Sequence, residues 1–409
     1  MPPSVLILGG GYGGAWTARH LPVGEATIVS DQNFLLFTPM LAEVAAGDVD
    51  PRHIATPIRQ LAPRAGFVQG SIESIDLANR SVVVRPGFGL DSRTLTGDVL
   101  VLALGGVPAT FGVPGVEQFA ISFKTIGDAL RIRNRVLGLL ESSAGQTDPH
   151  LTSVAVVGAG YSGCEVAASV ADFMRAAHHR YFRDAPAPSM TLVDAVDRVA
   201  PGLSRRLSQA ADRALGKRGV KLELGRRVAA VDPKGITLED GSTVDAATVI
   251  WAAGSRSHPL VADLNLPMEK GRLVVDRQMR AAPNVFALGD AALVPSGESG
   301  FSSQTAQFAL RQGAWLGKNL TRIVAGDEVP RFEYKTLGEL VSLGHRNAVG
   351  MIMGIPAAGF VGWFLWRSYY LLRLPGVMRK ARVALDWTLD LVFGPDIAWL
   401  PTSDLGPDV

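Results

Sequence analysis

The sequence predicts an α/β fold in which two parallel-sheet domains of the same kind follow one another along the chain. Three observations support this prediction. An apolar strand pattern leads into a glycine-rich turn and a helical pattern at residues 4–21, the same arrangement recurs at residues 154–174, and each copy is followed by another apolar strand pattern that ends in glycine. At 409 residues the chain suits two or three domains of about 100 to 200 residues each.

The composition of the chain excludes several classes of function. A formal net charge of +2 gives no global reason to expect nucleic-acid binding. The single cysteine, Cys164, excludes an internal disulfide, and the seven histidines are scattered, so we expect no metal site and a reducing compartment. The N-terminus has no basic region followed by a long apolar stretch, so we expect a cytoplasmic chain without a secretion signal.

The first glycine-rich turn, at residues 9–14 (GGGYGG), follows a β-branched apolar run at residues 4–8 that is typical of a buried parallel strand. Gly9 allows the tight turn, Gly11 lets a pyrophosphate approach the backbone, and Gly14 lets helix and strand pack closely. The pyrophosphate then lies at the helix N-terminus, where free amides favour negative charge. The pattern predicts a Rossmann-like dinucleotide site, and a merely structural glycine turn is the alternative. The candidate residues are Gly9, Gly11, Gly13 and Gly14.

A polar pair follows the second strand of this domain. Residues 26–29 form the strand pattern, and Ser30 and Asp31 come directly after it. In dinucleotide-binding domains an acid at this strand end binds the ribose hydroxyls, but here the acid arrives one position late. Asp31 is therefore either the ribose ligand or a solvated turn residue, in which case Ser30 or backbone groups make the contact.

The second glycine-rich turn, at residues 158–163 (GAGYSG), repeats the fingerprint between a strand pattern and a helical pattern. The next strand pattern ends at Asp194, whose carboxylate would accept hydrogen bonds from an unphosphorylated ribose and repel a 2′-phosphate. This site therefore favours NADH over NADPH. Arg198 is either a phosphate contact that weakens this preference or a solvated loop charge. The candidate glycines are Gly158, Gly160 and Gly163.

Three further segments complete the predicted sheets. Residues 99–105 (VLVLALG) and 249–254 (VIWAAG) are buried-strand patterns that end in glycine, one in each domain. Residues 285–290 (VFALGD) form another strand pattern, which ends in an acid and precedes a helical pattern. Asp290 at this strand end either binds a sugar-like hydroxyl chain or caps a helix. Residues 178–183 (HHRYFR) are expected in an exposed loop without a catalytic role.

The last part of the chain differs in character. Residues 347–366 carry no ionisable side chain and are long enough on paper to span a membrane, but their glycines and Pro356 suit a strand and turn better than one helix. Between residues 360 and 393, basic side chains are interleaved with aromatic and leucine side chains, which is typical of helices that lie in a membrane interface. A dimer interface or a helix that covers the core is the alternative.

With these motifs the chain resembles the type II NADH:quinone oxidoreductases, single-subunit flavoenzymes with two glutathione-reductase-like dinucleotide-binding domains. The likeness runs nearly end to end. Besides the two fingerprints, it rests on residues 33–47 (NFLLFTPMLAEVAAG), 123–125 (FKT), 128–129 (DA), 163–165 (GCE), 249–254 (VIWAAG), 289–290 (GD) and 306–309 (AQFA), and on Phe332, Tyr334, Gly344, Ala348 and Val349.

The resemblance implies a role for each part of the chain. Residues 1–118 and 272–330 are expected to form an FAD-binding domain, residues 119–271 an NADH-binding domain, and residues 331–409 a strand and amphipathic-helix region. That last region would be a monotopic anchor in membrane lipid or a homodimer contact, on the cytoplasmic face of the cell membrane. The FAD site would include the first group of glycines, Ser30, Asp31, Lys124, Gly289, Asp290, Ala306 and Gln307. The NADH site would include the second group of glycines, Glu165, Asp194, Ala253 and Gly254.

The resemblance also implies roles for individual side chains. Asp290 would contact the ribityl chain of FAD, Glu165 would lie beside the nicotinamide and the flavin, and Gln307 would lie where the flavin meets the quinone. The family usually reads Ala-Gln-x-Ala-x-Gln at residues 306–311, but this chain ends the motif with Arg311, a third catalytic candidate. The family's usual lysine in the next segment is Leu337 here. Either a cation has moved from one wall of the quinone pocket to the other, or the acceptor has changed.

The predicted reaction is a ping-pong transfer of electrons from NADH through flavin to a membrane quinone, without proton pumping. The cofactor carries the chemistry, and the protein supplies orientation and electrostatics. A disulfide reductase or a sulfide:quinone oxidoreductase needs a redox pair of cysteines, and we expect Cys164 to be a packing residue. Two alternatives stay open: a related NAD(P)H-dependent flavoprotein with a non-standard acceptor, and a membrane-bound flavin scaffold or redox sensor with little turnover.

Overall fold

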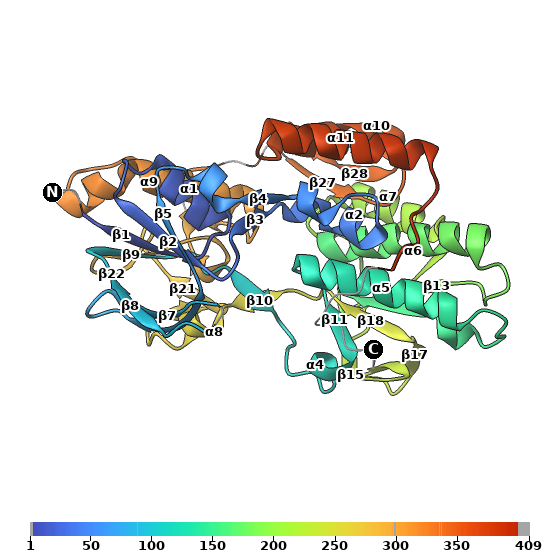
Figure 1. Cartoon of the computed structure of the whole chain (residues 1–409). Coiled ribbons are helices and arrows are strands. Elements are labelled where there is room, and N and C mark those ends of the chain that lie inside the picture. Colours follow the sequence, from blue (N-terminus) through green and yellow to red (C-terminus); the bar gives the residue numbers. More distant parts are fainter. Residues whose placement is uncertain (1–2, 88, 298–299, 335, 337, 400–409) are drawn as a thin grey trace. The chain divides into compact units, whose positions relative to one another are not determined.

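The computed structural model describes residues 3–87, 89–297, 300–334, 336 and 338–399 of the chain (Figure 1). The chain forms two compact units, each assembled from separate stretches of sequence. Unit 1 comprises residues 1–36, 55–107 and 255–336. Unit 2 comprises residues 37–54, 108–254 and 337–409.

The bounds of the units differ from the predicted domains. Residues 37–54 and 108–118 lie in unit 2 although they were expected in the FAD-binding domain, and residues 255–271 lie in unit 1 although they were expected in the NADH-binding domain. The C-terminal region from residue 338 is grouped with unit 2. Sequence patterns place elements but do not show which sheet a connecting segment packs on.

A six-stranded sheet forms the centre of unit 1. Its strand order is β22-β23-β9-β1-β2-β5, and neighbours are parallel except for β22, which runs antiparallel to β23 at one edge. In that order the strands are Arg280–Ala282, Val285–Ala287, Val99–Leu102, Val5–Leu8, Ala26–Ser30 and Gly66–Gln69. The predicted buried strands of this domain are thereby confirmed.

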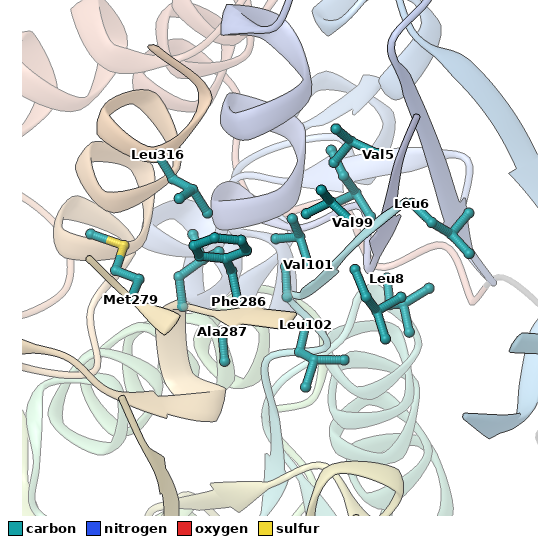
Figure 2. Close-up of a cluster of buried hydrophobic side chains, with 14 of the residues drawn as sticks. Val5, Leu6, Leu8, Val99, Val101, Leu102, Met279, Phe286, Ala287 and Leu316 are labelled. Carbon is teal, nitrogen blue, oxygen red and sulfur yellow. The ribbon is translucent and has the colours of Figure 1, made fainter. Parts of the chain in front are cut away.

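The side chains of these strands form the core of unit 1 (Figure 2). Leu8, Leu102 and Phe286 are completely buried. Parallel sheets are covered on both faces, which is why their strands appear in the sequence as continuous apolar runs. Leu316, from helix α9 (Ala306–Ala325), packs into the same cluster.

Helix α1 (Tyr12–His20) packs closely against α9 within unit 1. The close approach depends on glycine, because a Cβ at Gly313 would overlap the carbonyl oxygen of Gly13 and lie 3.1 Å from the amide nitrogen of Thr17. A Cβ at Gly317 would overlap the carbonyl oxygen of Thr17. Helix α9 therefore holds α1, and with it the first glycine turn, in place.

A five-stranded parallel sheet forms the centre of unit 2. Its strand order is β11-β18-β12-β13-β14, and the strands are Ala120–Ser122, Thr248–Trp251, Ser153–Val157, Ser189–Asp194 and Val220–Leu224. Strand β12 lies between β13 and β18, as β1 lies between β2 and β9 in unit 1. The two units repeat one arrangement, as the two fingerprints predict. Helices α5 (Ile126–Ser142), α6 (Tyr161–Tyr181) and α7 (Arg205–Gly216) belong to unit 2.

Smaller elements complete each unit. Unit 1 also contains β3 (Phe34–Leu36), β4 (Ala55–Pro57), α3 (Ile58–Leu61), β6 (Ser71–Asp76), β7 (Ser81–Arg85), β8 (Arg93–Thr96), β19 (Ser255–Ser257), α8 (Pro259–Ala262), β20 (Met268–Glu269), β21 (Arg272–Val274), β24 (Ala292–Leu293), β25 (Pro295–Ser296) and β26 (Gly300–Phe301). Unit 2 also contains α2 (Leu41–Ala46), α4 (Val116–Phe119), β15 (Val228–Asp232), β16 (Gly235–Leu238) and β17 (Thr243–Asp245). Strand β10 (Gly106–Pro108) lies at the boundary.

The C-terminal region of unit 2 is an antiparallel sheet followed by two helices. The sheet contains β27 (Gly338–Ser342), β28 (Ala348–Ile352) and β29 (Ile355–Ala358), and the helices are α10 (Gly359–Arg373) and α11 (Val377–Val392). The prediction of strand and turn from residue 347 is confirmed up to Ala358, after which the chain becomes helical. Among the helices of the described residues, none is long and apolar enough to cross a membrane.

Helices α10 and α11 are amphipathic. Trp366 is 1% exposed and Trp387 is 6% exposed, whereas Phe360 and Phe364 are 59% and 58% exposed. One face of the pair is therefore part of the core of unit 2, which confirms the alternative of a core-covering helix for that face. The other face presents large apolar side chains to the outside.

The prediction of a loop at residues 178–183 is wrong for its first four residues. Residues 178–181 form the last turn of helix α6. The physical reason is the helix dipole, because His178, His179 and Arg180 are cationic or polar groups placed where the carbonyl end of a helix favours positive charge.

Candidate functional site: two glycine turns and their surroundings

The first glycine turn joins β1 to α1 in unit 1. Gly9 has a φ of +108°, a conformation that favours glycine. A Cβ at Gly14 would overlap the carbonyl oxygen of Gly9, and a Cβ at Gly13 would lie 2.8 Å from a methyl group of Leu288. At Gly11, by contrast, a Cβ would meet no protein atom within 4 Å. Among the four candidate glycines, packing within the protein explains Gly9, Gly13 and Gly14, and Gly11 borders open space.

The two polar residues after β2 lie next to each other at the end of the strand. Ser30 is buried, and its hydroxyl donates to Oδ1 of Asp31 at 3.5 Å. Asp31 is exposed, and the same oxygen accepts a hydrogen bond of 2.8 Å from the amide of Gln32. This geometry is compatible with a ribose contact through Asp31 and with one through Ser30.

Gly289 and Asp290 form a tight turn after β23, beside the start of α9. The amide of Gly289 donates a 2.8 Å hydrogen bond to Oε1 of Gln312, which is 1% exposed. The carbonyl of Asp290 accepts a 3.2 Å hydrogen bond from Gln304. Sequence reasoning missed Gln312, although a polar side chain on the otherwise apolar buried face of α9 is a signal that could have found it.

Gln307 and Arg311 lie one turn apart on α9, and Tyr334 connects them. The phenol of Tyr334 donates a 3.0 Å hydrogen bond to Oε1 of Gln307. The guanidinium of Arg311 lies over the Tyr334 ring, 4.2 Å from its centroid, and donates to the carbonyl of Gln307 at 3.4 Å. Arg311 is therefore held against an aromatic face. The other departure from the family pattern, Leu337, lies outside the described residues.

The second glycine turn joins β12 to α6 in unit 2 and has the same geometry as the first. Gly158 has a φ of +108°, and a Cβ there would lie 2.6 Å from the carbonyl carbon of Ala252. A Cβ at Gly163 would overlap the carbonyl oxygen of Gly158, whereas one at Gly160 would meet no protein atom within 4 Å. The same division between packed and open glycines thus recurs.

Asp194, at the end of β13, is anchored next to this turn. Its Oδ1 accepts a 2.9 Å hydrogen bond from the amide of Val196, and its Oδ2 accepts from the amide of Ala159 inside the glycine turn. Arg198 donates to the carbonyl of Pro201 at 2.5 Å. This local hydrogen bond favours the interpretation of Arg198 as a loop charge.

Gly254 and Lys124 lie in unit 2 at the ends of neighbouring elements. Gly254 has a φ of +137°, and its carbonyl accepts a 3.0 Å hydrogen bond from Ala109. Ala253 packs partly buried against the adjacent hydrophobic cluster. The amide of Lys124 donates at 3.0 Å to Oδ2 of Asp128, in the capping box that starts α5. The assignment of Lys124 to the FAD site stays a prediction.

Glu165 lies in the first turns of α6, five residues after the open glycine. Its Oε1 accepts a 3.1 Å hydrogen bond from the amide of Ser342 on β27. Part of its surface is accessible, but protein encloses the carboxyl group, and this burial raises its pKa to about 8. The hydrogen bond from the Ser342 amide opposes that rise. Glu165 is therefore a carboxyl that can carry a proton near neutral pH.

Cys164, beside Glu165, is fully buried and its thiol donates to the carbonyl of Ala159 at 3.3 Å. Burial raises the pKa of the thiol to about 12, which keeps it protonated. This agrees with a packing residue and gives no basis for cysteine redox chemistry.

Comparison with known proteins places this geometry in a family. The model of the pyridine nucleotide-disulphide oxidoreductase family matches residues 3–313. The type II NADH:quinone oxidoreductase Ndh of Mycobacterium tuberculosis is 31% identical over 413 residues, which cover 94% of this chain and 87% of the relative. The chain belongs to the type II NADH:quinone oxidoreductases. The internal alternative NAD(P)H-ubiquinone oxidoreductase A1 of Arabidopsis thaliana is also 31% identical, with 97% and 85% of the two chains covered.

Solved structures have the same fold as this chain. NDH2 from Plasmodium falciparum in complex with NADH superposes with a TM-score of 0.90 at 19% identity, covering 97% of this chain and 100% of that one. The ferredoxin reductase for the CYP199A2 system of Rhodopseudomonas palustris reaches 0.68 at 21% identity, covering 85% and 82%. The predicted family is confirmed, and the chain is an NADH-driven flavoprotein oxidoreductase.

Proposed function

We propose that this chain passes electrons from NADH through bound FAD to a membrane quinone, without pumping protons. The observation that carries the proposal is the pair of open glycines, Gly11 and Gly160. Packing within the protein would allow a side chain at either position. A pyrophosphate that approaches the backbone would not, and this explains why both residues are glycine. The names of the relatives, NADH:quinone and NAD(P)H-ubiquinone oxidoreductases, support the identity of donor and acceptor.

The residues of unit 1 fit FAD. No side chain caps α1 at Gly11, so its first amides are available to a pyrophosphate. Ser30 or Asp31 would hold the ribose, Asp290 the ribityl chain, and Ala306 and Gln307 at the start of α9 the flavin ring. When bound, FAD supplies the two-electron chemistry that no protein side chain offers.

The residues of unit 2 fit NADH in the same way. No side chain caps α6 at Gly160. Asp194 is held by two backbone amides, so its negative charge is fixed where a 2′-phosphate would be repelled. Rates of flavin reduction should therefore be higher with NADH than with NADPH, and Asp194→Ala should narrow the difference. Arg198→Ala is the matched control and should leave the preference unchanged, because its guanidinium is bound to a loop carbonyl.

The acceptor side of the proposal rests on Gln307, Arg311 and Tyr334. The stacked guanidinium of Arg311 presents a fixed cation where the family holds a neutral amide, so a quinone ring must bind beside an Arg–Tyr pair. We propose that this arrangement slows reoxidation by common quinones while leaving flavin reduction fast. Arg311→Gln should then speed reoxidation by ubiquinone or menaquinone analogues and leave the reduction by NADH nearly unchanged. Rapid reoxidation of the unmodified protein would show that the departure is compensated.

The outer face of α10 and α11 is proposed to lie on the lipid surface at the cytoplasmic side of the cell membrane, with homodimer formation as a second use of the same region. Its exposed apolar side chains are Phe360, Val361, Phe364, Leu372, Val377, Met378, Leu385, Leu389, Leu391, Val392 and Phe393, and its cations are Arg373, Arg379, Lys380 and Arg382. Apolar groups and cations together are what an interfacial helix needs. The double variant Phe360→Ser with Phe364→Ser should sediment less with anionic liposomes, while Leu90→Ser, an equally exposed position in unit 1, should not change sedimentation.

Stopped-flow kinetics of the two half-reactions test the proposed function. Anaerobic mixing with NADH should bleach the flavin, and mixing of the reduced protein with a soluble quinone analogue should restore it. Failure of the first step argues for a flavin scaffold. Failure of the second step with every quinone tried argues for a non-standard acceptor.

A further inference from the structure

A buried charge pair lies in unit 2 outside the residues assigned above. Every residue of helix α2 is buried, including Glu43, which is 5% exposed. Oε2 of Glu43 accepts a 3.1 Å hydrogen bond from the Trp387 indole, and Oε1 lies 3.7 Å from Nη2 of Arg367. Arg367 is 8% exposed and stacked between two indoles, with its Cζ 4.3 Å from the Trp363 ring centroid and 4.5 Å from that of Trp387.

Glu43 and Arg367 lack part of their possible hydrogen bonds. The 3.7 Å separation is longer than a hydrogen bond, and Nε of Arg367 is buried without a hydrogen-bond partner among the described residues. A buried carboxylate with so few partners is costly in its charged form. Burial raises the pKa of Glu43 to about 7, against the opposing effects of Arg367 and Trp387. Glu43 therefore changes charge near neutral pH.

Helix packing places the pair in the same part of unit 2 as Glu165. Glu43 and Glu165 lie on helices α2 and α6, which pack against each other within unit 2. Trp366, next to Arg367 on α10, is fully buried near Trp387. Negative charge on Glu43 raises the pKa of Glu165. Buried tryptophans fill this region, and charge interactions are stronger in such a low-dielectric environment than in water.

We propose that Glu43 and Arg367 are positioning residues that act through Glu165, by setting whether its carboxyl holds the proton that quinone reduction consumes. The inference rests on the proposed function, in which NADH, a proton and a quinone give NAD⁺ and a quinol. The hydride of NADH supplies both electrons and one hydrogen, so the second hydrogen must arrive as a proton. Ionised Glu43 disfavours a negative charge on Glu165 and so keeps the Glu165 carboxyl protonated. The positive charge of Arg367 stabilises the ionised form of Glu43.

Other charged groups around the pair are mostly negative. Asp386 and Asp390 on α11 both raise the pKa of Glu43. Burial raises the pKa of Asp48, which follows α2, and the charges of Asp390 and Glu43 raise it further. Asp386 is bound to His53 at 2.5 Å, and Asp390 lies 3.9 Å from Nδ1 of His345. These acids oppose ionisation of Glu43. Arg367 is thus the cation that counteracts them, and its removal should leave Glu43 neutral at pH 7.

Infrared titration of carboxyl groups tests the proposal on the full-length, FAD-loaded protein. The C=O band lost in Glu165→Gln identifies Glu165, whose midpoint should lie near pH 8 in the unmodified chain. In Glu43→Gln that midpoint should fall by about one pH unit, the effect of removing one charge at a partly buried site. Arg367→Gln should lower it in the same direction, and Arg367→Lys, which keeps the cation, should restore it. Glu117→Gln on α4, an exposed position, is the matched control and should have no effect.

The pH profile of flavin reoxidation by a soluble ubiquinone analogue should move by the same amount as the infrared midpoint. An unchanged Glu165 midpoint in folded Glu43→Gln protein would overturn the inference. If Glu43→Gln does not fold, equal midpoints in Arg367→Gln and Arg367→Lys would overturn it instead. If the unmodified protein does not reduce any quinone, the proposed function is refuted. The infrared midpoint of Glu165 in the variants still shows whether Glu43 and Glu165 interact.

Discussion

The second glycine turn allows a test that separates folding from ligand binding within three residues. Gly158 has a φ of +108°, and a Cβ there would lie 2.6 Å from the carbonyl carbon of Ala252. Gly160 has a φ of −66°, and a Cβ there would meet no protein atom within 4 Å. The same substitution, glycine to alanine, should therefore have opposite consequences at the two positions.

Gly158→Ala should lower the free energy of unfolding by about 2 to 6 kcal/mol. Of this, about 1 to 3 kcal/mol comes from the strained backbone, and about 1 to 3 kcal/mol from overpacking against the neighbouring strand end. Gly160→Ala should leave the free energy of unfolding unchanged or raise it by up to about 1 kcal/mol, because alanine restricts the unfolded chain. Its methyl group should nevertheless weaken dinucleotide binding at least about tenfold, or about 1.4 kcal/mol, since it lies where the pyrophosphate approaches the backbone.

Urea unfolding measures the first effect, and calorimetric binding of NAD⁺, which leaves the flavin oxidised, measures the second. The unmodified protein is the reference for both. An equal loss of stability in the two variants would show that Gly160 is a structural glycine. Unchanged NAD⁺ affinity in Gly160→Ala would show that the pyrophosphate does not bind at this turn.

Three further predictions follow from contacts within single units. Gln312→Leu removes the hydrogen-bond acceptor of the Gly289 amide. The free energy of unfolding in urea should therefore fall by about 1 to 3 kcal/mol, and the protein should retain FAD less tightly. Removal of the chain after residue 393 takes away two backbone carbonyls that bind the buried Arg133 at 2.7 and 2.8 Å, so the melting temperature should fall, and Arg133→Met should recover part of the loss. The pKa of Glu165 is raised to about 8, so its contribution to stability is full below about pH 4.5 and lost by about pH 8. The free energy of unfolding of Glu165→Gln, measured in urea, should exceed that of the unmodified protein at about pH 9 and match it at about pH 4.

The elements that sequence patterns predicted are those with local causes. Strands β1 and β12 are continuous apolar runs, and each is followed by a turn whose first glycine has a positive φ. Both signals lie within about ten residues of sequence, so one chain is enough to find them. The strands before Gly105 and Gly254 were found for the same reason.

Most of the functional surroundings depend on contacts between residues far apart in sequence. Gln312 reaches back to Gly289, and Arg311 stacks on Tyr334. The Glu43–Trp387 hydrogen bond spans 344 residues. A glutamate in an apolar segment is a weak signal in one sequence, because its partner cannot be identified before the chain is folded.

An anaerobic titration of the purified full-length protein tests most directly whether one chain binds two dinucleotides. The protein should be yellow, release one FAD per chain on denaturation, and lose its flavin absorbance on addition of one equivalent of NADH, with NADPH slower. A subsequent equivalent of a soluble quinone should restore the absorbance. A colourless protein that also fails to bind added FAD, or a bound flavin that NADH leaves oxidised, would contradict the assignment of the two glycine turns.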